Sequence, residues 1–174
     1  GHEITYTYNT GGLLTSQLDE NGLESSFVYD GMERMILVDY PDPDPDIRYE
    51  YDGLGNRVEM TDTVGMTTWE YDGVNRVIIT TDPFTGTVYY AYDGASNRIT
   101  LTYPGSKIVS NEYDAAYRLE RVTDWNSQVI TYTYDRSGRQ LSESLPNGVV
   151  TLHTYDDNGH ILSIAHSRDA ETLS

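Results

Sequence analysis

The sequence predicts an all-β fold: an array of about eight antiparallel β-hairpin repeats forming a twisted, spiralling open sheet. A tyrosine-led phrase such as "TYTYDRSG" at 131–138 recurs at a nearly constant interval along the chain. Strand-forming Tyr, Thr and Val alternate with the turn residues Asp, Asn, Pro and Gly. Apolar residues nowhere keep a helical period over three turns without a Gly or Pro interruption. Because the repeat fills the sequence, we expect residues 1–174 to be a single array taken from a longer protein.

The second tyrosine of each phrase marks the repeat. Taken as an anchor, it recurs at intervals of 21, 22, 20, 21, 21, 21 and 21 residues. A fixed period of this length is typical of proteins in which each repeat buries its apolar face against its neighbours. The eight anchors are Tyr8, Tyr29, Tyr51, Tyr71, Tyr92, Tyr113, Tyr134 and Tyr155.

Charged residues keep the same period. An Asp oxygen can accept backbone N–H groups of its own turn and pair with a nearby Arg, so we interpret both rows as structural. Acid–base catalysis needs one pair of groups whose environments differ, whereas the members of each row occupy equivalent positions in their repeats. The Asp row directly follows seven anchors and consists of Asp30, Asp52, Asp72, Asp93, Asp114, Asp135 and Asp156. The Arg row lies five or six residues after six anchors and consists of Arg34, Arg57, Arg76, Arg98, Arg118 and Arg139.

Each repeat supplies two strands. The residue two before the anchor is aromatic in six repeats, as at Tyr49 and Trp69, and residues i and i−2 of a strand share a face. We therefore expect two aromatic columns on one face, with rings stacked one repeat apart as a structural ladder. The second strand often has large apolar residues three apart, as at Met35 and Val38. This spacing favours a bulge repeated in each unit, and the alternative is a strand covered on both faces.

Composition excludes several classes of function. The chain has 11 basic and 28 acidic residues, and its formal net charge of −17 disfavours nucleic acid and anionic membranes as partners. No run of 18 apolar residues predicts insertion into a membrane, and the N-terminus does not resemble a signal peptide. The chain lacks Cys, which excludes disulfides and thiolate metal sites.

We predict neither a metal site nor a cofactor. The acidic segment "PDPDPD" at 41–46 lacks the Gly and the closing Glu of an EF-hand loop, which leaves a solvated acidic turn as the better interpretation. The histidines at 153, 160 and 166 match no compact metal-ligand spacing.

Four of the aromatic residues outside the two columns lie 11 to 13 residues after their anchors. We expect them along one turn-lined edge of the sheet, where nearby Asp and Asn side chains would complete a sugar-binding strip. The alternative is that they only cover the ends of the aromatic columns. These four candidate ligand-binding residues are Tyr40, Phe84, Tyr103 and Trp125.

The segment "YTYDRSGRQL" at 132–141, with looser copies in the other repeats, resembles the YD-repeat or RHS-repeat family. The resemblance runs from about residue 6 to residue 164. It implies β-hairpins that wind into a spiralling sheet. In the large members, bacterial RHS proteins, toxin-complex shells and teneurins, that sheet forms a hollow shell or part of a cell-surface adhesion protein, and some members are reported to bind sugars. The segment "AHSRDAETLS" at 165–174 is unlike the family's self-cleaving core, so no catalytic residue is carried over.

We therefore expect a non-enzymatic spacer, scaffold or shell wall within a large secreted or surface-exposed bacterial protein. The alternative is a carbohydrate-binding or adhesion module that uses the four aromatic residues. A glycosidase would need two carboxylates in distinct environments, and the sequence offers only ranks of equivalents. The expected partners are neighbouring repeats or domains of the same protein. The bare edge strands of an open array also predict that the ends are capped by the terminal residues or pair end to end.

Overall fold

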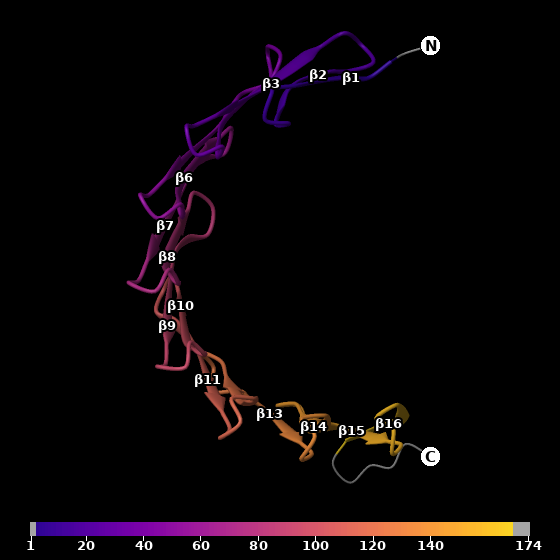
Figure 1. Cartoon of the computed structure of the whole chain (residues 1–174). Helices are drawn as coiled ribbons and strands as arrows, with labels where there is room; N and C mark the ends of the chain where they lie inside the picture. The colour runs from indigo at the N-terminus through magenta and orange to yellow at the C-terminus, as the bar shows by residue number, and fades with distance from the viewer. Residues whose placement is uncertain (1–2, 169–174) are drawn as a thin grey trace. The chain divides into compact units, whose positions relative to one another are not determined.

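The computed structural model describes residues 3–168, which form sixteen β-strands and no helix. The strands follow one another in chain order, β1 to β16, in one antiparallel sheet that is open at both ends (Figure 1). The predicted all-β array of eight hairpins is confirmed. Each hairpin pairs an odd-numbered strand, which ends at the anchor tyrosine, with the even-numbered strand that follows it.

The chain divides into two compact units, residues 1–87 and 88–174. The strands of the first unit are β1 (Thr5–Tyr8), β2 (Leu14–Leu18), β3 (Glu24–Tyr29), β4 (Met35–Asp39), β5 (Ile47–Tyr51), β6 (Arg57–Asp62), β7 (Gly65–Tyr71) and β8 (Val77–Asp82). Those of the second are β9 (Gly86–Tyr92), which begins at the boundary, β10 (Arg98–Tyr103), β11 (Lys107–Tyr113), β12 (Leu119–Thr123), β13 (Val129–Tyr134), β14 (Gln140–Ser144), β15 (Val149–Tyr155) and β16 (Ile161–Arg168).

Every hairpin contains a bulge beside its anchor. The register shifts there in each of the eight pairs of strands between residues 5 and 168. In the second hairpin Tyr29 pairs with Met35 and Val28 pairs with Leu37, which leaves Ile36 as the extra residue. Val38 then pairs with Phe27, so Met35 and Val38 both lie on the anchor face despite being three apart. The predicted bulge is confirmed.

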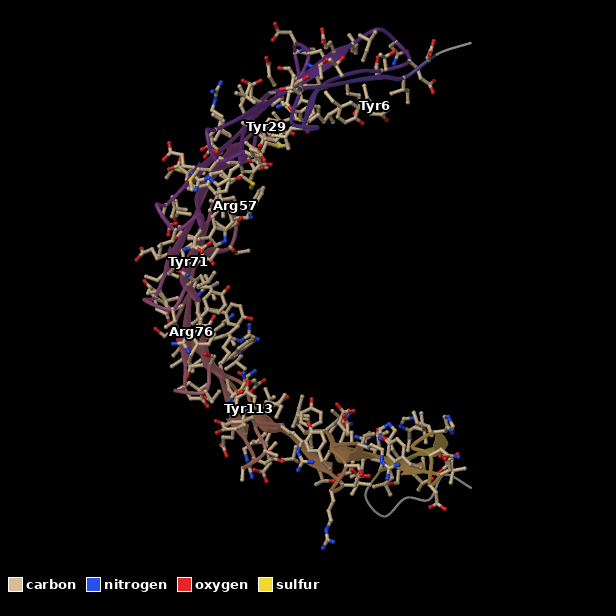
Figure 2. All side chains as sticks on the ribbon, viewed as in Figure 1. Tyr6, Tyr29, Arg57, Tyr71, Arg76 and Tyr113 are labelled. Carbon is tan, nitrogen blue, oxygen red and sulfur yellow. The ribbon has the colours of Figure 1, made fainter. Side chains whose placement is uncertain are left out.

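The anchor face carries the apolar contacts of the molecule. In β5, half-buried Tyr49 and Tyr51 flank exposed Glu50, as strand alternation requires. Figure 2 shows the side chains of Tyr29 and Arg57 on the same side of the first unit's ribbon. The described residues lie in a single layer, and no side chain among them is less than 2% exposed. The most buried are Val38 at 5%, Thr67 and Thr151 at 8%, and Val88 and Leu101 at 9%.

Each buried side chain is therefore shielded by neighbours on the same face of the sheet, and not by a second layer. Hairpin-to-hairpin contacts carry the stability of such a sheet.

Candidate functional site

The turn after each anchor has one construction throughout the described residues. In the second hairpin the Asp30 N–H donates to the Arg34 carbonyl at 2.9 Å, and the Glu33 N–H donates to the Asp30 carbonyl at 3.0 Å. The fourth residue after the anchor is left-handed, which is the geometry of a three-residue hairpin loop. These left-handed residues have φ between 60° and 92° and are Gly12, Glu33, Gly55, Asn75, Ser96, Tyr117, Gly138 and Gly159.

The residue after the anchor holds this turn through its side chain. Asp135 Oδ1 accepts the backbone N–H groups of Ser137 and Arg139 at 2.8 and 2.9 Å. These bonds favour the ionised carboxylate, so the Arg139 N–H, followed by the Arg139 side chain, lowers the pKa of Asp135. The same pair of backbone bonds forms at Asn9, Asp30, Asp52, Asp72, Asp93 and Asp114. The Asp row therefore makes the turn contacts that the sequence predicted.

Only four of the six grouped arginines occupy one structural position. They are the residues five after an anchor, and each donates through Nε to the Asp Oδ2 of its own turn. The four bonds join Arg34 to Asp30, Arg76 to Asp72 and Arg118 to Asp114 at 2.7 Å, and Arg139 to Asp135 at 2.6 Å.

The sequence-based grouping is wrong for Arg57 and Arg98, which lie six residues after their anchors. Asn56 occupies the fifth place in the third hairpin and donates through Nδ2 to Asp52 Oδ2 at 2.9 Å. Asn97 does the same to Asp93 at 2.9 Å. Arg57 instead lies over the Trp69 ring, with 4.4 Å from its guanidinium carbon to the ring centroid. A shift of one residue beside a bulge gives the side chain different neighbours, which the spacing alone could not reveal.

The anchor tyrosines connect successive hairpins. The Tyr51 hydroxyl donates to the Met35 carbonyl of the preceding hairpin at 2.8 Å. The acceptor is always the residue six after the preceding anchor. Further bonds of this kind join Tyr71 to Arg57 at 2.8 Å, Tyr113 to Arg98 at 3.0 Å, Tyr134 to Leu119 at 2.8 Å and Tyr155 to Gln140 at 2.7 Å. We call this contact, with the side chains around it, the repeat junction.

At no fewer than three junctions among the described residues, an arginine, and not a second aromatic ring, lies against the anchor ring. The Arg118 guanidinium carbon is 4.7 Å from the Tyr134 ring centroid, and Arg118 Nη1 donates to the Asp135 carbonyl at 2.8 Å. Arg34 likewise lies over the Tyr51 ring and donates to the Asp52 carbonyl. Arg139 lies over the Tyr155 ring and donates to the Asp156 carbonyl.

The predicted stacking of anchor rings one repeat apart is therefore replaced by guanidinium groups. Anchors are two strands apart, or roughly 10 Å at about 4.8 Å per strand, and direct ring contact requires about 4.5–7 Å.

The four candidate ligand-binding aromatics are only partly brought together. In the second unit the Tyr103 and Trp125 ring centroids are 6.1 Å apart, with the planes at 74°. Lys107 Nζ lies 5.4 Å from the Trp125 centroid, a contact that the sequence reasoning missed. In the first unit Tyr40 lines a hollow with Asp44, Pro45, Ile47, Asp62 and Thr63, whereas Phe84 is 79% exposed. The Tyr103–Trp125 pair is therefore the part of the predicted strip that could contact a ligand with two rings at once.

Between residues 3 and 168 no three His, Asp or Glu side chains are placed to hold a metal ion. His160 Nδ1 lies 3.0 Å from Asp156 Oδ2, and His166 Nδ1 lies 3.0 Å from Thr151 Oγ1. Over the same residues no helix is long and apolar enough to span a bilayer.

Comparison with known proteins identifies related repeats and a shared fold. The family model described as RHS Repeat matches residues 51–87 and 134–172. No curated protein matches the chain. The crystal structure of TcdB2-TccC3 matches with a TM-score of 0.76 at 19% identity, covering 96% of this chain and 10% of that one. The Photorhabdus luminescens Tc holotoxin pore with a mutated TccC3 matches with a TM-score of 0.74 at 18% identity, also covering 96% and 10%. At these identities the likeness shows the fold, and the chain spans about a tenth of those proteins' length.

Proposed function

Since this chain carries repeats of the RHS family, we propose that it is a non-catalytic structural segment, a spacer, scaffold or shell wall, of a larger protein of that family. Matching chains of the same fold are about ten times as long, which supports neighbouring repeats or domains as its partners. The likeness to a Tc holotoxin component supports a secreted or surface-exposed parent protein.

The recurrence of one junction carries this proposal. Among the described residues, the same hydroxyl-to-carbonyl bond joins hairpins at no fewer than five places, with lengths of 2.7 to 3.0 Å. Catalysis depends on groups whose environments differ from one another, whereas these contacts repeat with the period of the sheet. Contacts of this kind maintain the spacing of strands, which is the property required of a wall or spacer.

The distribution of charge agrees with this role. The formal net charge of −17 favours solubility of a single-layered sheet whose faces both meet solvent. Apolar side chains such as Leu54 and Val74 are 76% and 67% exposed at turn tips, so charge is the main protection against aggregation.

The test compares stability with biological activity in the full-length parent protein. Junction variants such as Tyr134→Phe and Tyr155→Phe should lower activity only in proportion to their loss of folding stability. Control variants with polar substitutions at exposed Glu50 and Glu70 should leave both unchanged. A variant that keeps the parent's unfolding free energy and still abolishes activity would show that the segment does chemistry or binding, and would contradict the proposal.

The Tyr103–Trp125 pair favours a second candidate, a carbohydrate-binding or adhesion role. Trp125 is 48% exposed and Tyr103 is 38% exposed, and their rings meet edge to face. The side chain of Asp124 accepts backbone N–H groups of its own turn at 2.8 Å, which holds Trp125 in a defined loop. An exposed aromatic pair on a rigid turn offers the apolar surface on which a sugar ring stacks.

Tryptophan fluorescence during titration with a panel of soluble oligosaccharides tests this candidate. The chain has two tryptophans, so Trp69→Phe isolates the Trp125 signal. The double variant with Trp69→Phe and Trp125→Phe is the reporter-free control. Saturable quenching in Trp69→Phe that Tyr103→Ala weakens would support binding at the pair. No change in Trp125 emission across the panel ends the idea.

A further inference from the structure

The guanidinium of Arg57 has no polar partner within the described residues. The junction fixes the backbone of this residue, because the Arg57 carbonyl accepts the Tyr71 hydroxyl at 2.8 Å. Asn56 makes the turn contact with Asp52, at 2.9 Å, that an arginine makes in four other hairpins. Arg57 is thus released from the turn, and between residues 3 and 168 its N–H donors form neither a hydrogen bond nor an ion pair.

Two aromatic rings hold this guanidinium in place. Its central carbon lies 4.4 Å from the Trp69 ring centroid and 5.6 Å from that of Tyr49. Tyr49 is in β5 and Trp69 is in β7, the strands on either side of β6, which carries Arg57. A cation over an aromatic ring is attracted to the ring face, and the contact uses none of its N–H donors. The side chain is therefore ordered before a ligand binds, and its donors are still available.

The acidic residues of these two hairpins do not neutralise Arg57. Arg57 pairs with the anchor Tyr51 and lies on the anchor face, whereas Glu59 pairs with Glu50. Strand alternation places Glu50 and Glu70, each next to an anchor, on the opposite face. The remaining acidic side chains of residues 47–82 accept backbone N–H groups of their own turns, and they are Asp52, Asp62, Asp72 and Asp82. This part of the anchor face therefore presents an unneutralised positive charge, in a chain whose formal net charge is −17.

We propose that Arg57, together with the Tyr49 and Trp69 rings, binds a ligand in which a carboxylate is attached to a flat apolar group. The planar fork of a guanidinium matches the two oxygens of a carboxylate. The rings beside it offer apolar surface to the rest of the ligand. The large negative net charge of the chain repels multiply charged anions such as phosphate, so a single carboxylate fits better. This binding role goes beyond the structural function proposed above, which requires no ligand.

The fifth hairpin provides an internal comparison. Arg98 lies six residues after its anchor, as Arg57 does. The residue two before the next anchor is Asn111 there, where the fourth hairpin has Trp69. Asn111 Nδ2 donates to the Arg98 carbonyl at 2.8 Å, and within the described residues no ring holds the Arg98 guanidinium. The proposed site thus needs the ring of Trp69, which makes Arg98→Gln a matched control for Arg57→Gln.

Heteronuclear NMR of the folded chain during titration with phenylacetate tests the proposal. We expect saturable shifts of the Arg57 Nε–H and Trp69 indole N–H signals, while the Trp125 indole signal does not move. Arg57→Gln should weaken binding about tenfold or more, because a hydrogen bond between charged groups is lost. Arg57→Lys keeps the charge but not the fork, so its affinity should lie between those of Arg57→Gln and the unmodified chain. Arg98→Gln should bind phenylacetate as the unmodified chain does.

Related probes separate the contribution of the charge from that of the rings. Phenylacetamide is neutral and should bind about tenfold more weakly than phenylacetate. Acetate has no ring and should also bind more weakly. The Arg57 side chain is exposed, so both Arg57 variants should keep the circular dichroism of the unmodified chain.

Three results would overturn the inference: no saturable shift at Trp69, equal binding of phenylacetate and phenylacetamide, or undiminished binding by Arg57→Gln. Acetate or inorganic phosphate binding as tightly as phenylacetate would also overturn it, because the rings would then select nothing. None of these results bears on the proposed structural function, which is tested through the stability and activity of the parent protein.

Discussion

Replacing Tyr134 with Phe removes one atom from one repeat junction. The Tyr134 hydroxyl donates to the Leu119 carbonyl at 2.8 Å, while the ring remains in place under the Arg118 guanidinium at 4.7 Å. Phe keeps the ring, its burial and its contact with the cation, so only the hydrogen bond is lost. One such bond contributes about 1 kcal/mol, and we expect the junction between β12 and β13 to be destabilised by about that amount.

Amide hydrogen exchange is the appropriate assay, because a repeat array opens locally and a single global unfolding free energy can miss the change. A loss of about 1 kcal/mol predicts roughly fivefold faster exchange for amides of β12 and β13. Amides of β3 and β4 should not change. The matched control is Tyr29→Phe, at the same repeat position but without a hydrogen bond from its hydroxyl among the described residues, and it should leave exchange unaltered. Equal effects of the two substitutions, or none from Tyr134→Phe, would refute the assignment of the hydroxyl as the link between hairpins.

Three further predictions concern the turns and the titrating groups. Gly138 has φ +85° and open space around it, so Gly138→Ala should lower the free energy of unfolding by about 1 kcal/mol through backbone strain. Glu33 has φ 62°, and Glu33→Gly relieves this strain, so it should raise the free energy of unfolding by about 0.5 kcal/mol. Urea unfolding measures both. The pKa of Asp135 is lowered in the folded state, which stabilises the fold above about pH 4, and this stabilisation is lost as pH falls through the folded pKa. Asp135→Asn should therefore flatten the acid limb of stability. Burial raises the pKa of Tyr134 in the folded protein. The hydrogen bond of its hydroxyl should therefore persist until pH rises through this raised pKa, which ultraviolet titration of the phenol would measure.

Periodicity was enough to predict the strands and the bulge. The strand pleat decides the face of each side chain near an anchor such as Tyr51, and this gives a local period of two. The bulge places Met35 and Val38 on one face, and this gives their spacing of three. The Asx-type turn at Asp30 was predictable for the same reason, since its partners lie within four residues.

Contacts between hairpins were harder to predict. The grouping of Arg57 with Arg34 failed because a one-residue offset beside a bulge gives Arg57 different neighbours. The Tyr103–Trp125 contact joins residues 22 apart, and no local rule specified that these two rings would meet while Phe84 stayed exposed.

The sequence alone thus determined the repeat unit: its two strands, its bulge and its carboxylate-held turn, because each depends on interactions within about ten residues. Only the tertiary structure decided how one unit joins the next, through an anchor hydroxyl on the preceding carbonyl and an arginine between successive rings. The physical reason is distance. Equivalent residues lie about 21 positions apart in the chain and roughly 10 Å apart across two strands, so a third side chain fills the space between them, and its identity follows from the register.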